Sequence, residues 1–127
     1  MTNWRPEFNP DHLYFVTTKA VDYQHLFRRD LIKRLLVDAL DCMQLRKHLS
    51  LYAFVIMPNH IHLIIQCPAD YPVKDAVRDY KKHVSDRLIR QYQVENNQRV
   101  LNFLAAKVTR SGKQSYKVWE TGYDARN

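Results

Sequence analysis

The segment HIHLIIQ, residues 60–66, constrains the fold of this chain more than any other stretch. Successive side chains of an extended strand point to opposite faces, so these seven residues divide into two sets. One face carries Ile61, Leu63 and Ile65, and the other carries His60, His62, Ile64 and Gln66. We therefore predict a half-buried strand whose second face carries either chemistry or a satisfied pair of polar groups.

The residues before this strand predict its first partner. The run LSLYAFVIM, residues 49–57, is rich in apolar and aromatic residues, and Pro58 and Asn59 follow it directly. So short a connection joins antiparallel strands. We expect a hairpin with its turn at Pro58 and Asn59.

The rest of the chain predicts one earlier strand, two or three helices and one late strand. Residues 12–18, HLYFVTT, alternate as a strand, and residues 30–43 have apolar residues at helical spacing, with Asp30 as a possible N-cap. A second amphipathic helix is expected from residue 73 to residue 88, and residues 91–106 continue as helix with a bend at the Asn96–Asn97 pair. Residues 115–120, SYKVWE, alternate as a late strand after a turn at Gly112.

This order of elements predicts an α+β fold. An antiparallel sheet of about four to five strands with helices packed on one face buries every apolar surface and leaves the second face of the sheet open for a ligand. The 127 residues fit a single domain, 1–127, that buries its own core.

The composition indicates the cellular compartment and the kind of binding partner. Six of the seven net positive charges lie in residues 74–127, and a basic half of this kind suits a polyanion, although it also tunes solubility. The longest apolar run is too short to span a bilayer, and two cysteines without a metal-binding spacing fit a reducing cytoplasm. We expect a cytoplasmic protein without a membrane segment.

The histidine pair allows two interpretations. Two imidazoles on one face of a strand can converge on one divalent cation, with a third ligand from a distant segment. Alternatively, His60 caps the turn and His62 bonds a backbone or carboxylate partner, as a purely structural pair.

The string YAFVIMPNHIHLII, residues 52–65, resembles the HUH strand of the small single-strand tyrosine transposases, including those associated with repetitive extragenic palindromes. The segments YFVTTKAV, LFRRD, VRDYKKHVSDRL and YKVWETGYD are similar to other parts of that family. The resemblance implies the ferredoxin-like or RRM-like fold of HUH transposases. It also implies a metal-dependent endonuclease and strand transferase that acts on single-stranded DNA with hairpin, or palindromic, structure.

In that family two histidines hold Mg²⁺ or Mn²⁺, so the resemblance implies His60 and His62 as the metal ligands. A tyrosine on a C-terminal helix, with Gln or Asn four residues later, attacks the DNA and forms a 5′-phosphotyrosine. Tyr123 with Asn127, and Tyr92 with Asn96, have this spacing. Too few residues follow Tyr123 for a helix, and Tyr92 fits an amphipathic helix, so we expect that the chain ends before the true nucleophile.

Other predictions concern DNA and assembly. We expect Tyr80 in the core and DNA phosphate contacts from the basic side chains of the second helix, Arg78, Lys81, Lys82 and Arg87. A homodimer is possible by resemblance. One alternative is a nonenzymatic module that binds single-stranded or hairpin nucleic acid. Another is a histidine-triad-like nucleotide hydrolase, which would need a third histidine where the sequence has Ile64.

Overall fold

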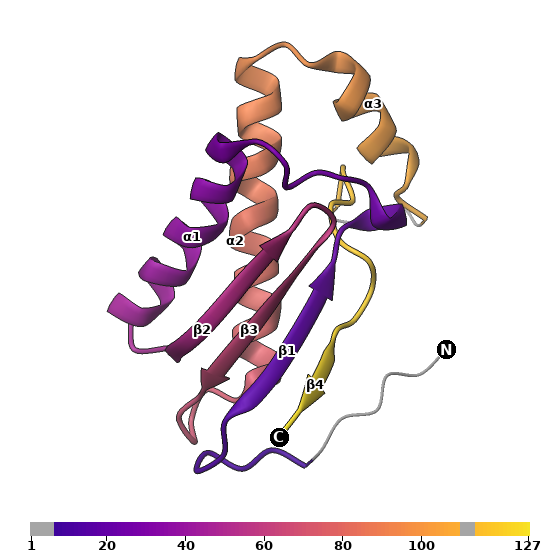
Figure 1. The fold of residues 1–127 in the computed structure, drawn as a ribbon. Helices are drawn as coiled ribbons and strands as arrows, with labels where there is room; N and C mark the ends of the chain where they lie inside the picture. The colour runs from indigo at the N-terminus through magenta and orange to yellow at the C-terminus, as the bar shows by residue number, and fades with distance from the viewer. Residues whose placement is uncertain (1–6, 110–113) are drawn as a thin grey trace.

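The computed structural model describes residues 7–109 and 114–127 and shows the predicted α+β fold (Figure 1). Four strands form one sheet in the order β2-β3-β1-β4, and each pairs antiparallel with its neighbours. The elements are, in chain order, β1 (Tyr14–Lys19), the short 3-10 turn η1 (Val21–Tyr23), α1 (Asp30–Leu45), β2 (Ser50–Met57), β3 (His60–Gln66), α2 (Val73–Val94), α3 (Gln98–Ala106) and β4 (Asp124–Arg126).

Two interleaved β-α-β units build this sheet. β1, α1 and β2 form the first unit and β3, α2 and β4 form the second, and each unit leaves a gap that a strand of the other unit fills. Two β-α-β units interleaved in this way form the ferredoxin-like fold. Figure 1 shows α2 behind the sheet, with α1 beside it, so the other face of the sheet remains open.

The core lies between the sheet and the helices, and β3 shows this division most clearly. Ile61, Leu63 and Ile65 are at most 2% exposed, whereas the alternate residues of β3 are half-buried. The expected hairpin is confirmed, because Met57 pairs with His60 across the two-residue turn. The alternation in the sequence therefore correctly predicts that both histidines lie on the sheet face opposite the core.

The helices form where the apolar spacing predicts them, but two of their ends differ from the predicted ones. Asp30 is the first residue of α1 rather than its N-cap, which is Arg29 without a side-chain bond. α2 runs six residues past the expected end and contains Tyr92. The predicted bend follows it: Asn96 has φ 55°, and the Asn97 side chain accepts a hydrogen bond from the backbone N–H of Val100 at the start of α3.

The turn predicted at Gly112 lies outside the described residues, and the late strand predicted at residues 115–120 is wrong. Only Trp119 forms an isolated bridge there, to Ala20, and the fourth strand is β4, several residues later. Val118 and Trp119 are both buried although they are adjacent, because the Trp119 indole turns toward α2 and donates its Nε1–H to the carbonyl oxygen of Lys81 at 3.0 Å. The Trp119 side chain thus ties this segment to α2, and residues 115–120 form a single bridge and no strand.

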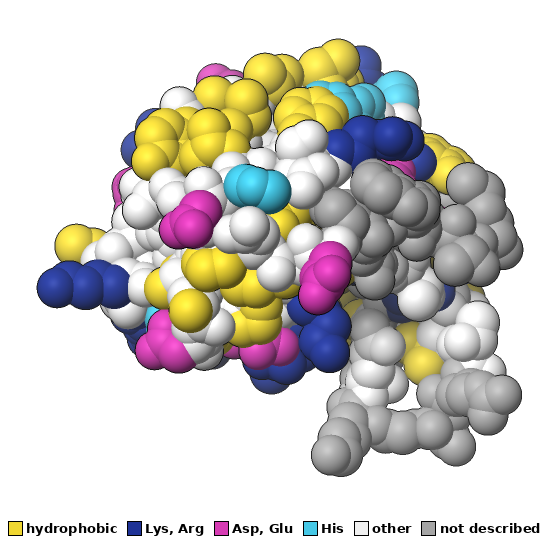
Figure 2. Space-filling model, turned by 90° about the horizontal axis from the view of Figure 1, so that it is seen from below, with side chains coloured by type: hydrophobic (Ala, Val, Ile, Leu, Met, Phe, Trp, Pro, Cys, Tyr) yellow, Lys and Arg dark blue, Asp and Glu magenta, His cyan; other side chains and the backbone are white. Residues whose placement is uncertain are grey.

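Apolar side chains are exposed around the open face. Phe15, Val55 and Met57 have 44%, 53% and 39% of their surface exposed, and their strand pairings place them in line with the histidine side of β3. Figure 2 shows hydrophobic side chains and histidine gathered on the side of the molecule that carries this face. Among the described helices, none combines the length and the apolar composition that crossing a membrane requires.

Candidate active site

The two histidines of β3 lie side by side on the open face. Their ring centroids are 4.7 Å apart, and the ring planes meet at 81°. On the neighbouring strand β1, Lys19 is paired with His60 and Thr17 is paired with His62. Because β3 lies between β2 and β1, the pair is held on an inner strand of the sheet. The one-residue spacing in the sequence thus becomes a pair of adjacent imidazoles.

Each imidazole uses its Nδ1 atom in a contact within the protein. Nδ1 of His60 lies 2.7 Å from Oδ1 of Asn59, and Nδ1 of His62 lies 2.9 Å from the hydroxyl of Thr17. Histidines that bind metals commonly have their second nitrogen held in this way. The arrangement makes Nε2 the nitrogen available to a ligand in both rings.

The surroundings also set the charge and the orientation of the rings. Burial of the ring, then the charge of His62 and that of Lys19, lower the pKa of His60 below its usual value. A lowered pKa favours the neutral imidazole, which is the form that binds metal. Phe15 stacks on His62 with centroids 5.2 Å apart and planes at 15°, so an apolar contact and Thr17 together orient this ring.

The donor atoms allow a test of whether Mg²⁺ or Mn²⁺ fits here. Mg²⁺ binds mainly oxygen ligands and retains water, whereas imidazole suits transition metals, so the pair favours Mn²⁺ over Mg²⁺. Within residues 7–109 and 114–127, no three His, Cys, Asp or Glu side chains are grouped so that they could hold a metal ion. His60 and His62 therefore fit as part of a metal site, and among the described residues no third His, Cys, Asp or Glu is grouped with them.

The first tyrosine candidate, Tyr92, lies in the core. It is on α2 and 5% exposed, and burial raises the pKa of its hydroxyl. Asn96 follows the end of α2 in a left-handed conformation, so Tyr92 and Asn96 do not share a helical face. Tyr80 is also buried, as expected, and donates its hydroxyl hydrogen to the carbonyl oxygen of Leu36 at 3.0 Å.

The second candidate, Tyr123, lies nearer to the histidine strand. It immediately precedes β4 and lines a cavity of about 240 Å³ together with Thr17 and Lys19. These two residues of β1 are the ones paired with the histidines. The fourth residue after Tyr123, Asn127, lies beyond the end of β4 and its amide is 3.1 Å from Nδ1 of His12, so this pair does not lie on a helix either.

Two of the four expected DNA contacts on α2 are paired with carboxylates. The Arg78 guanidinium bonds Asp75 at 3.1 Å and Asp79 at 3.0 Å, and these carboxylates help to raise its pKa. Lys82 lies 3.1 Å from Asp86, one turn further along the helix. Lys82 and Asp86 are both exposed, so a polyanion could compete with this carboxylate, whereas the carboxylates that bond Arg78 are half-buried.

The other two basic residues differ from each other. Lys81 donates to the carbonyl oxygens of Glu120 at 2.9 Å and Gly122 at 2.8 Å, and thereby ties α2 to the segment before β4. Arg87 is exposed. The structure therefore gives Lys81 a structural role and leaves Arg87 as a surface cation.

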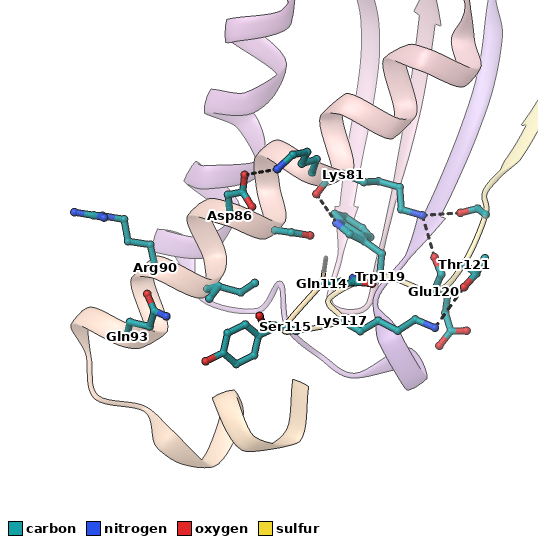
Figure 3. Close-up of a pocket in the computed structure, with 15 residues that line it drawn as sticks. Lys81, Asp86, Arg90, Gln93, Gln114, Ser115, Lys117, Trp119, Glu120 and Thr121 are labelled. Atoms are coloured by element: carbon teal, nitrogen blue, oxygen red, sulfur yellow. Dashed lines mark hydrogen bonds and ion pairs between the residues drawn. The ribbon is translucent and has the colours of Figure 1, made fainter. Parts of the chain in front are cut away.

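A groove of about 710 Å³ runs between α2 and residues 114–122 (Figure 3). Buried Trp119 lies in it, and Lys117 contacts the Thr121 hydroxyl at 3.3 Å. Figure 3 shows Arg90 extending outward from α2 at the rim of the groove. Cations outnumber carboxylates in the lining, which contains Lys81, Lys82, Arg90 and Lys117 against Asp86 and Glu120. The sequence reasoning did not find Arg90 and Lys117, because only the tertiary fold brings them together.

Sequence reasoning also missed the residues that hold the histidines. The sequence pattern places Thr17 and Phe15 in a strand and Asn59 in a turn, and does not indicate their contacts with the histidines. Pairing the strand at residues 12–18 with the histidine strand would have placed Thr17 next to His62. Asp124, whose carboxylate lies 4.0 Å from Nζ of Lys19, is paired with Thr17 on the far side of β1 and belongs to a strand that the sequence pattern does not predict.

Comparisons with known proteins identify the family of this chain. The family model described as transposase IS200 like matches residues 11–125. The chain therefore belongs to the IS200-like transposase family. No curated protein matches it.

Two solved structures have the same fold. One is described as a REP-associated tyrosine transposase bound to a REP hairpin; its TM-score is 0.64 at 16% identity, over 99% of this chain and 61% of that one. The other is a candidate transposase from Deinococcus radiodurans R1, with a TM-score of 0.64 at 18% identity, over 100% of this chain and 85% of that one. This chain thus spans 61% of the length of the hairpin-bound transposase.

Proposed function

We propose that this chain carries the metal-binding half of a transposase active site that cleaves and rejoins single-stranded DNA with hairpin structure. The observation that carries the proposal is the pair His60 and His62, whose Nδ1 atoms are both engaged while their Nε2 atoms are available on an open face. Membership of the IS200-like transposase family supports the same reaction class.

His60 and His62 would hold Mn²⁺, or less favourably Mg²⁺, through Nε2. A bound cation would neutralise the negative charge that develops on the scissile phosphate. Lys19, paired with His60 on the neighbouring strand, adds a positive charge at the same end of the face. Attack by a tyrosine would give a 5′-phosphotyrosine and a free 3′-hydroxyl, which conserves the phosphodiester energy for rejoining.

Tyr123 and Tyr92 are the two tyrosines considered as nucleophiles, and neither shares a helical face with its asparagine. We therefore propose that the attacking tyrosine comes from a segment outside residues 1–127. This part of the proposal is tested separately from DNA binding. A covalent adduct between the 127-residue chain and a single-stranded oligonucleotide, with the modified tyrosine mapped by mass spectrometry, would overturn it.

Hairpin DNA is the proposed partner. A structural neighbour is described as bound to a REP hairpin, and this chain carries six of its seven net positive charges in residues 74–127. Arg87, Lys82 and the groove cations Arg90 and Lys117 are exposed or line an open groove, and they suit phosphate contacts. Hairpin affinity should fall steeply as salt concentration rises.

A titration with hairpin DNA tests the proposal. Fluorescence anisotropy of a labelled hairpin with a single-stranded flank should show binding that Mn²⁺ strengthens. The double variant His60→Ala/His62→Ala should lose the Mn²⁺ effect, and the control His12→Ala, which changes a histidine at the other end of the sheet, should retain it. An Mn²⁺ effect that persists in the double variant would contradict the assignment of the metal ligands.

A second candidate function is a nonenzymatic module that binds single-stranded or hairpin nucleic acid. The observation that favours it is that, within the described residues, no third His, Cys, Asp or Glu side chain lies close enough to the histidine pair to complete a metal site. In this case hairpin binding should be indifferent both to Mn²⁺ and to the histidine substitutions. Light scattering of the same sample tests the homodimer that the resemblance allows, and a monomeric mass would reject it for this chain.

A further inference from the structure

Asn59, the second residue of the turn before β3, is held from two sides. Its side-chain oxygen Oδ1 lies 2.7 Å from Nδ1 of His60, and its side-chain nitrogen Nδ2 donates to the carbonyl oxygen of Tyr23 at 3.3 Å. Its own backbone carbonyl accepts the N–H of Ala20 at 2.9 Å. The asparagine therefore links the turn of the hairpin to the loop that follows β1.

These contacts determine which way the amide group is turned. A backbone carbonyl only accepts hydrogen bonds, so the Asn59 atom facing Tyr23 has to be the NH₂ group. The oxygen then faces His60, and because an amide oxygen also only accepts, Nδ1 of His60 has to carry the hydrogen. In a neutral imidazole the lone pair is consequently on Nε2.

The carbonyl of Tyr23 is itself held in place by the short turn η1. Asp22 and Tyr23 have φ values of 51° and 54°, which are uncommon for residues other than glycine. The N–H of Tyr23 bonds the carbonyl of Ala20 at 3.0 Å, and the N–H of Phe27 bonds the carbonyl of Pro58 at 3.0 Å. The loop and the hairpin turn are thus fastened to each other at several points around Asn59.

His62 has a different kind of partner. The hydroxyl of Thr17, 2.9 Å from its Nδ1, can either donate or accept a hydrogen bond. This contact therefore permits both neutral forms of His62, whereas Asn59 permits only one form of His60. The two histidines are adjacent and similar in sequence, but only His60 is restricted to a single form by its hydrogen bond.

We propose that Asn59, held by the carbonyl of Tyr23, is a positioning residue that fixes the hydrogen of His60 on Nδ1 and so presents Nε2 to the metal. The consequence for metal affinity rests on the proposed function, but the position of the hydrogen does not. The partner that fixes a metal-binding histidine typically contributes a factor of about 10 to 100 in affinity.

Long-range ¹H–¹⁵N NMR of the metal-free protein at neutral pH tests the inference directly. His60 should show one form with the hydrogen on Nδ1. Asn59→Ala should give a mixture of the two forms. Asn59→Asp keeps an acceptor for His60 but loses the NH₂ group that bonds the Tyr23 carbonyl, so it should favour the Nδ1 form more than Asn59→Ala does and less than wild type does. Asn102→Ala changes an exposed asparagine of α3 and should leave His60 unaltered. A wild-type His60 that carries its hydrogen on Nε2 would overturn the inference even if no variant folds.

Mn²⁺ affinity, measured by electron paramagnetic resonance, supplies the second readout. Asn59→Ala should bind Mn²⁺ about 10- to 100-fold more weakly than wild type. Unchanged affinity in Asn59→Ala would overturn the role in metal binding. If the wild type itself fails to bind Mn²⁺, the proposed function fails, and the NMR result still decides what Asn59 does to His60.

Discussion

The two faces of β3 are made from neighbouring residues, yet they differ in nearly every physical property. On the helix side, Ile61 and Leu63 are at most 2% exposed and belong to the core. On the open side, His60 and His62 are half-buried and bonded to Asn59 and Thr17. The first face contributes apolar burial to stability, and the second contributes donor atoms. The comparison teaches that stability and chemistry can be changed separately on one strand.

The largest effect is expected from Ile61→Ala. This side chain is fully buried, and truncating a buried isoleucine costs about 2–5 kcal/mol because it removes apolar contacts and leaves a cavity. The free energy of unfolding from urea denaturation measures the change. The matched control is Ile64→Ala on the half-buried open side, which should cost clearly less. Equal losses would show that the two faces do not differ in their contribution to stability.

His62→Ala should affect Mn²⁺ affinity more than stability. Loss of one of two imidazole ligands should weaken Mn²⁺ binding by about 100-fold or more, at least as much as loss of a supporting partner. Stability should fall by about 0.5–1.5 kcal/mol, less than in Ile61→Ala, because the half-buried ring loses its stacking on Phe15. Calorimetric titration and urea denaturation of the same sample measure the two effects. A large loss of stability with unchanged Mn²⁺ affinity would assign His62 to the core.

Phe15→Ala sharpens the comparison, because Phe15 is an apolar residue on the open face. Its stacking on His62 should contribute about 0.5–1.5 kcal/mol beyond burial, so the unfolding free energy should fall modestly. Mn²⁺ affinity should fall less than in His62→Ala, since the ligand remains and only its orientation is loosened. Val55→Ala, on β2 and 53% exposed, is the control. An effect of Val55→Ala as large as that of Phe15→Ala would exclude a specific role for the stacking.

The smallest effect is expected outside both faces, at the exposed pair of Arg29 and Glu95. Hydrogen bonds from Arg29 and then Gln91 lower the pKa of Glu95 to about 2. A lowered carboxylate pKa means that the pair stabilises the fold above the unfolded pKa of about 4.5, and that this contribution is lost as pH falls toward 2.

Arg29→Met should therefore reduce stability slightly at pH 7 and flatten its dependence on pH between about 4.5 and 2. Thermal unfolding across this range gives the slope. Arg34→Met, a change of an exposed cation on α1, is the control and should leave the slope as it is. A wild-type slope that Arg29→Met does not alter would show that the pair contributes nothing.

The sequence by itself determined the parts of this protein that depend on local periodicity. The alternation at residues 60–66 assigned both histidines to the same face, and the Pro58–Asn59 turn paired β2 with β3. The bend between α2 and α3 was also predicted, since consecutive asparagines favour a cap over a continuous helix. In each case the interacting residues are close in the chain, so composition and spacing are sufficient.

Only the tertiary structure decided the features whose partners are distant in sequence. Residues 115–120 alternate as a strand would, but the indole of Trp119 bonds the backbone of α2, and β4 therefore forms later. Thr17 and Tyr23 act on the histidine strand only because β1 and its loop lie beside β3. Hydrogen bonds of this kind depend on register and on loop geometry, which the alternation of polar and apolar residues does not encode.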